Sequence, residues 1–112
     1  MGLKPFAAGL ALAILIAPPA SAQRTRFDAI NGCERLGMVK FKRHDAAFRR
    51  FVIDRASVEA DKFADKAGNQ FVSTVFHGKA LYEAAAGPKT VSFICLHGGS
   101  GRGPVFVYTL GD

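Results

Sequence analysis

The sequence predicts an α+β domain in which an N-terminal helix, or two helices, is pinned by a disulfide to a three- to five-stranded antiparallel sheet. After residue 22, the first part of the chain carries apolar residues at helical spacing. The second part is rich in β-branched and aromatic residues, which favour strands. The two cysteines, Cys33 and Cys95, lie one in each part.

The first 22 residues have the pattern of a secretory signal peptide. Lys4 is positively charged, Phe6 to Ala17 is apolar, and the small residues Ala20 to Ala22 precede Gln23. The apolar run is shorter than the roughly 20 residues of a membrane-spanning helix. We therefore expect cleavage near Ala22/Gln23 and a single small domain over residues 23–112, exported to the periplasm or secreted. No membrane span is expected.

The cysteine pair is expected to form a disulfide. A domain of this size buries too little surface to be very stable alone, and an oxidising compartment favours the bond. A bridge from Cys33 to Cys95 closes a loop of about 62 residues, worth roughly 4 kcal/mol in the chain-entropy model. A redox pair would favour the spacing C-x-x-C, and structural zinc needs four ligands.

The segment from Phe27 to about Met38 predicts a short amphipathic helix with Cys33 on its buried face. Gly32 and Gly37 weaken this prediction, because each costs roughly 1 kcal/mol inside a helix. The flanking residues 23–26 and 111–112 are expected to be frayed. Apolar residues recur at every third position, at Phe27, Ile30, Cys33 and Leu36.

Two alternatives remain open for residues 45–67. A second helix capped by Asp45 is preferred, because it puts the apolar residues of 47–52 on one face. The alternative is a strand over 48–53, whose alternation Arg49 and Arg50 interrupt. Residues 57–67 suit either a helix ending at Gly68 or a strand that turns at 65–69.

The remainder is predicted to be β-structure. Residues 71–76 form one strand, which continues over 80–82 past a bulge at Gly78. A turn at 86–88 leads to a strand over 90–97, which is apolar on both faces and therefore central. A glycine-rich connection, 98–104, precedes the last strand at 105–110. The nine phenylalanines after residue 22 are expected mostly in the core.

The full chain has a net charge of +6, of which Lys4 leaves with the signal peptide. A net positive charge of this size is common on a solvent-exposed surface that only keeps a protein soluble, but a basic face also attracts anionic partners. Nucleic acid is not expected in the periplasm. For an anionic partner we predict a site that includes Arg49, Arg50, Lys79 and Arg102. The charge excess is concentrated in one stretch, at Lys40, Lys42, Arg43, Arg49, Arg50 and Arg55.

The stretch from His97 to Pro104 is most simply a hairpin connection, although its glycine amides could form an anion-binding nest. It lacks the Gly-Lys-Ser/Thr of a phosphate-binding loop. His44, His77 and His97 lack metal-ligand spacing. Ser100 has no nucleophile elbow and no third group to orient His97. We therefore predict no catalytic residues, no metal site and no cofactor.

The stretch from Phe48 to Val107 resembles uncharacterised small exported disulfide-bonded proteins of Gram-negative bacteria. The resemblance rests on an early cysteine and a strand of the form Val-x-Phe-x-Cys, here residues 91–95. The resemblance implies an exported domain that is held together by a disulfide, and it implies no particular activity. Residues 78–82 are also similar to the Ser-Gly-x-x-Tyr motif of periplasmic c-type lysozyme inhibitors. In this chain His77 replaces the serine, and Tyr82 falls one residue late.

These observations predict a non-enzymatic periplasmic or secreted protein that binds an anionic envelope component or a protein partner through a basic face. The alternative is an inhibitor of an envelope-targeting enzyme such as lysozyme. The oligomeric state does not follow from the sequence.

Overall fold

The computed structural model describes the backbone of residues 20–111 and the side chains of residues 26–111; most of the predicted signal peptide lies outside this range. One long helix, α2 (Ala20–His44), is followed by five strands. The strands are β1 (Arg50–Ile53), β2 (Glu59–Ala67), β3 (Gln70–Ala84), β4 (Gly87–His97) and β5 (Pro104–Leu110), with a 3-10 turn, η1 (Arg55–Ser57), between β1 and β2. All strand pairs are antiparallel, in the order β1-β3-β4-β5, and β2 also pairs with β3. The predicted α+β class is confirmed.

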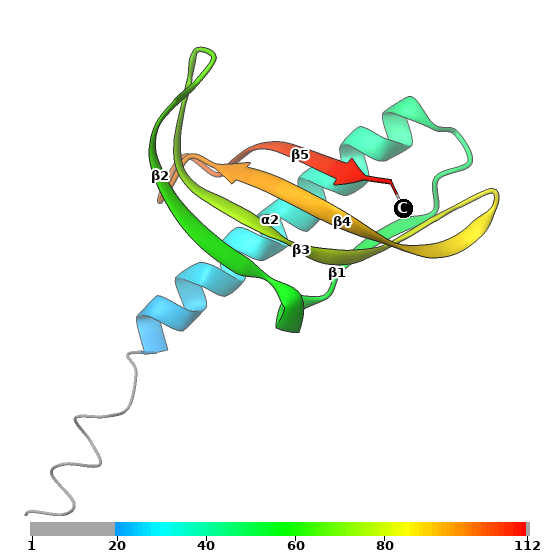
Figure 1. The fold of residues 1–112 in the computed structure, drawn as a ribbon, viewed down its shortest axis with the longest axis horizontal. Helices are drawn as coiled ribbons and strands as arrows, with labels where there is room; N and C mark the ends of the chain where they lie inside the picture. Colours follow the sequence, from blue (N-terminus) through cyan, green and yellow to red (C-terminus); the bar gives the residue numbers. More distant parts are fainter. Residues whose placement is uncertain (1–19, 112) are drawn as a thin grey trace, which may run out of the picture.

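Helix α2 crosses one face of the sheet diagonally (Figure 1). It is longer than the predicted segment 27–38 and includes Arg26, which was expected to be frayed. The two glycines that weakened the prediction lie where the helix approaches other elements closely. A Cβ on Gly37 would lie 2.7 Å from the Phe51 ring, and one on Gly32 would lie 3.3 Å from Pro104. The lack of space for a side chain therefore explains glycine at these two positions, despite its low helix propensity. Among residues 20–111, no helix is long and apolar enough to cross a membrane.

The predicted second helix after Asp45 is wrong, and the competing strand is correct. β1 alternates between exposed Arg50 and Val52 and buried Phe51 and Ile53. Asp45 accepts a hydrogen bond from the Ala47 amide within a turn and caps no helix. Residues 59–67 are likewise a strand, β2, which turns through two residues into β3.

β3 runs through Gly78 without the predicted bulge, because the β3–β4 register is continuous there. Gly78 is instead where the edge partner of β3 changes from β2 to β1. Ser57 of the intervening turn lies so close that a Cβ on Gly78 would be 2.8 Å from its hydroxyl oxygen. One register shift lies in β2, between Lys62 and Asp65, where Ala64 has a φ of 54°, and another lies in the β4–β5 pairing, between Leu96 and His97.

The core lies between α2 and the sheet. β4 is central, as predicted, and presents Val91, Phe93 and Cys95 to the helix. Cys33 on α2 is bonded to Cys95, with both cysteines fully buried and their Cα atoms 6.1 Å apart. The disulfide therefore joins the only helix among residues 20–111 to the central strand, as the sequence predicts.

The opposite face of the sheet is not covered by any other element in the described part of the chain (Figure 1). We call it the open face; its apolar residues are Val52, Val75, Leu81, Ile94, Leu96, Phe106, Tyr108 and Leu110. Phe106 and Tyr108 stack with their ring centroids 6.2 Å apart. The prediction that the phenylalanines mostly form the core is only partly correct, since Phe27, Phe63, Phe71 and Phe106 are exposed.

Three side chains of α2 reach backbone groups at the two margins of the sheet. Arg26 donates to the Val58 carbonyl and Lys40 to the Val107 carbonyl, each at 2.8 Å. Glu34 accepts from the Ile53 amide, also at 2.8 Å. The helix is therefore bound to both margins as well as to the core beneath it.

Candidate functional site

The α2–β1 connection and the β3–β4 hairpin lie together at one end of the molecule (Figure 1), and exposed cationic side chains lie on or beside them. We call this the basic end and define it by Lys42, Arg43, Arg49, Arg50 and Lys89, all exposed. Two carboxylates, those of Asp45 and Glu83, lie among them. The potential of this end is therefore positive at neutral pH.

An aromatic cluster holds the basic end together. The ring of Phe41, near the end of α2, packs 5.9 Å from Phe48 and 5.4 Å from Tyr82, measured between centroids. Phe48 and Tyr82 are also 5.4 Å apart. Burial raises the pKa of Tyr82, and the nearby Asp45 carboxylate raises it further. The charged side chains of the basic end therefore surround a cluster of packed, uncharged aromatic rings.

The predicted anion-binding residues are only partly brought together. Arg49 and Arg50 are neighbours at the basic end, and Arg50 Nε is 2.7 Å from a Glu83 carboxylate oxygen. Lys79 lies in the middle of β3, where it donates to the Ser92 hydroxyl at 2.9 Å. Arg102 lies in the β4–β5 connection, with its guanidinium 5.6 Å from the centre of the Phe71 ring. The four residues therefore do not form one site.

The glycine-rich connection between β4 and β5 satisfies most of its own amides. The Gly98 amide donates to the Gly103 carbonyl at 2.8 Å, and the amides of Arg102 and Gly103 both donate to the Gly99 carbonyl. The Gly99 amide donates to His97 Nδ1 at 3.0 Å. These four amides are therefore not available to an anion-binding nest.

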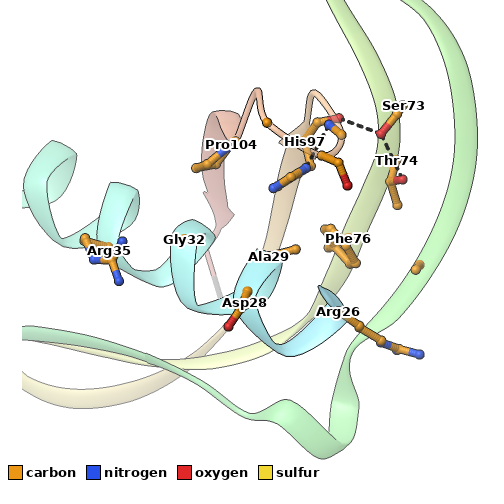
Figure 2. A pocket seen from close by; sticks show the side chains of 15 residues that line it. Arg26, Asp28, Ala29, Gly32, Arg35, Ser73, Thr74, Phe76, His97 and Pro104 are labelled. Carbon is orange, nitrogen blue, oxygen red and sulfur yellow. Dashed lines mark hydrogen bonds between the residues drawn. The ribbon is translucent and has the colours of Figure 1, made fainter. Parts of the chain in front are cut away.

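A groove lies between this loop, the first half of α2 and the ends of β3 and β4 (Figure 2). It is open to solvent, with a volume of about 850 Å³. His97 projects from β4 toward Ala29 and Gly32 of the helix, beside Phe76 (Figure 2). Its ring meets the Phe76 ring edge-on at 5.9 Å. Burial lowers the pKa of His97, which favours the neutral imidazole.

Two further groups of ionisable residues have structural roles. Glu34 pairs with Arg55 at 2.7 Å and joins the helix to η1. Burial alone would raise the pKa of Glu34, but hydrogen bonds from Arg55 and the Ile53 amide lower it overall. His77 lies on β3, 2.9 Å from a carboxylate oxygen of Asp61. Within the described residues, no three His, Cys, Asp or Glu side chains are arranged to hold a metal ion.

Comparisons with protein-family models, with curated proteins and with solved structures found no match. The surface features of this chain therefore carry the functional interpretation alone. Sequence reasoning missed Lys89, because two strand pairings, β3–β4 and β1–β3, are needed to bring it to the same end as residues some 40 positions earlier. It also missed the groove, whose walls come from four separate segments and share no motif.

Proposed function

We propose that this chain is an exported, non-catalytic binding protein that attaches to an anionic envelope component through its basic end. The observation that carries the proposal is the grouping of five exposed cationic side chains with only two carboxylates. Such an arrangement attracts anionic surfaces over about a Debye length, roughly 8 to 10 Å at physiological salt.

Two features support this assignment over a solvated face without a partner. Within the described residues, Arg50 is the only cation of the basic end in a salt bridge, and it is paired with Glu83. Lys42, Arg43, Arg49 and Lys89 keep their charges available for a partner. The aromatic cluster beneath them also fixes the backbone that carries them, which reduces the entropy lost on binding.

The test is binding of the oxidised mature chain to vesicles that contain phosphatidylglycerol, measured by co-sedimentation at low and high salt. We expect binding at low salt that weakens as salt rises. The double variant Arg43→Glu/Arg49→Glu should lose binding at least tenfold. The control Lys62→Glu/Lys66→Glu changes net charge equally but alters exposed residues of β2, and it should bind much better than the first variant.

Equal loss in the two double variants would show that overall charge alone governs binding, and would contradict a site at the basic end. No binding of the unaltered chain to vesicles or to an envelope extract would contradict the proposal altogether. Inhibition of purified lysozyme that survives Arg43→Glu/Arg49→Glu would favour the inhibitor class instead.

A further inference from the structure

The groove beside the β4–β5 loop contains a hydrogen-bond donor whose direction is fixed. The Nδ1 atom of His97 accepts the Gly99 amide, so the proton of the neutral imidazole is on Nε2. Figure 2 shows the ring directed away from the loop and toward Ala29 and Gly32. Among the described residues, Nε2 has no hydrogen-bond partner. The groove therefore presents this N–H to whatever enters it.

The other polar groups of the groove are also mainly donors. Arg26 and Arg35 line it from the helix, and Thr74 contributes a hydroxyl from β3. Arg26 donates one hydrogen bond to the Val58 carbonyl, but its guanidinium has five N–H donors. Asp28 is the one carboxylate among the lining residues. This excess of donors and positive charge complements an oxyanion.

Apart from the hydroxyls of Ser73 and Ser100 and the backbone of the loop, the remaining lining is apolar. Ala29 and Gly32 form the helix side, Phe76 lies on the sheet side, and Pro104 closes the groove near Gly32. The volume is within the roughly 300 to 1,000 Å³ typical of small-molecule sites. An ion that is polar on every side would leave these walls unused, whereas an apolar body would cover them.

We propose that the groove binds a small amphiphilic carboxylate, whose head accepts the His97 Nε2–H and whose apolar body lies along Ala29, Phe76 and Pro104. Arg26 and Arg35 lie on opposite sides of His97 and point away from it (Figure 2), so their guanidinium groups add positive charge around the groove and make no contact with the head. This site lies at the other end of the sheet from the basic end, so it neither requires the proposed function nor is required by it.

The test is a titration of the isotope-labelled mature protein with decanoate below its micelle-forming concentration, followed by NMR amide shifts. We expect saturable shifts confined to residues 28–35, 73–76 and 97–104. Decanol, which has the same chain without the charge, should bind at least tenfold more weakly. Acetate, which has the head alone, should not bind measurably.

Two pairs of variants locate the head. His97→Phe keeps a ring but removes the donor, and should weaken decanoate at least tenfold; decanol should weaken less, because its hydroxyl accepts only a neutral hydrogen bond. The matched control His77→Phe, on the open face, should leave both affinities unchanged. Arg35→Gln changes an exposed helix residue that does not threaten folding, and should weaken decanoate severalfold, whereas Arg43→Gln should have no effect.

Equal affinity for decanoate and decanol would overturn the proposed recognition of the head. Shifts centred on Phe106 and Tyr108 would place the ligand on the open face and overturn the groove. Unchanged decanoate affinity in both His97→Phe and Arg35→Gln would overturn it as well. Vesicle binding by the basic end is measured separately, so failure of one proposal leaves the other intact.

Discussion

The ion pair between Glu34 and Arg55 illustrates how single side chains join the helix to the sheet. Glu34 also accepts the Ile53 amide, so its carboxylate serves two elements at once. Hydrogen bonds to charged groups of this kind contribute about 2 kcal/mol each. Exposed pairs, such as Arg50 with Glu83, contribute about 1 kcal/mol or less.

We therefore expect Glu34→Gln to lower the free energy of unfolding by about 2 kcal/mol at pH 7. Since the folded pKa of Glu34 is below its usual value, this contribution is present at neutral pH and is lost as pH falls through the folded pKa. Urea unfolding at pH 7 and at pH 3 measures both effects. Glu83→Gln is the control, and an equal loss in the two variants would contradict the distinction.

His97 predicts a pH dependence of stability at milder acidity. Because burial lowers its pKa, the unfolded chain binds this proton more tightly than the folded protein. Stability should therefore fall as pH drops below about 6.5, until the pH is below the folded pKa. The charged groups that line the same groove are Arg26, Arg35 and Asp28.

The variant His97→Asn should flatten this dependence, since an Asn side chain can still accept the Gly99 amide but does not titrate. Urea unfolding between pH 7.5 and 5.5 provides the measurement. His44→Asn at the exposed end of α2 is the control, and it should keep the slope of the unaltered protein. A slope that persists in His97→Asn would assign the effect to another group.

At the scale of elements, the packing of α2 on β1 depends on a missing side chain. A Cβ on Gly37 would lie 2.7 Å from Cδ2 of Phe51, which is fully buried. We expect Gly37→Ala to destabilise the protein by about 1 to 3 kcal/mol, although alanine gains about 1 kcal/mol in helix propensity. Gly32→Ala should cost less, because its nearest neighbour is 3.3 Å away. Thermal unfolding of both variants decides the order.

The elements that sequence predicts best are those whose pattern reflects burial. β4 is central, and five of the six residues from Val91 to Leu96 are apolar, so its identity as a strand is evident. β2 buries no side chain, and only its pairing with β3 holds it extended, which leaves no periodic signal. β1 is only four residues long. The alternation of buried Phe51 and Ile53 is therefore too short a signal to outweigh the helical spacing of the apolar residues around it.

The candidate sites were harder to predict than the fold for a related reason. A run of charges such as Arg49-Arg50 is visible in the sequence, but the position of Lys89 depends on a hairpin register. The residues that surround His97 in the groove come from α2, β3 and the β4–β5 loop, so they meet only in the folded protein. Its donor geometry is a property of tertiary structure and leaves no local pattern.

At the scale of the whole molecule, one covalent bond connects the two halves of the fold. The Cys33–Cys95 disulfide spans 62 residues, and the chain-entropy model gives roughly 4 kcal/mol for such a loop. That is a large part of the 5 to 15 kcal/mol typical of small domains. We expect Cys33→Ala/Cys95→Ala to lose about this amount in urea unfolding. Adding a reductant should weaken the unaltered protein and leave the double variant unchanged.

The side chains of α2 that reach the sheet margins also limit how the protein meets its own copies. Unpaired backbone groups at a sheet edge are templates on which a second chain can add a strand and begin a fibril. Lys40 donates a hydrogen bond to the Val107 carbonyl on β5, and Glu34 accepts one from the Ile53 amide on β1. β2 is protected differently, by its bulge and by charged residues along its length. A molecule with one uncovered apolar sheet face thus has its edges partly blocked, which disfavours the addition of a second chain at these positions.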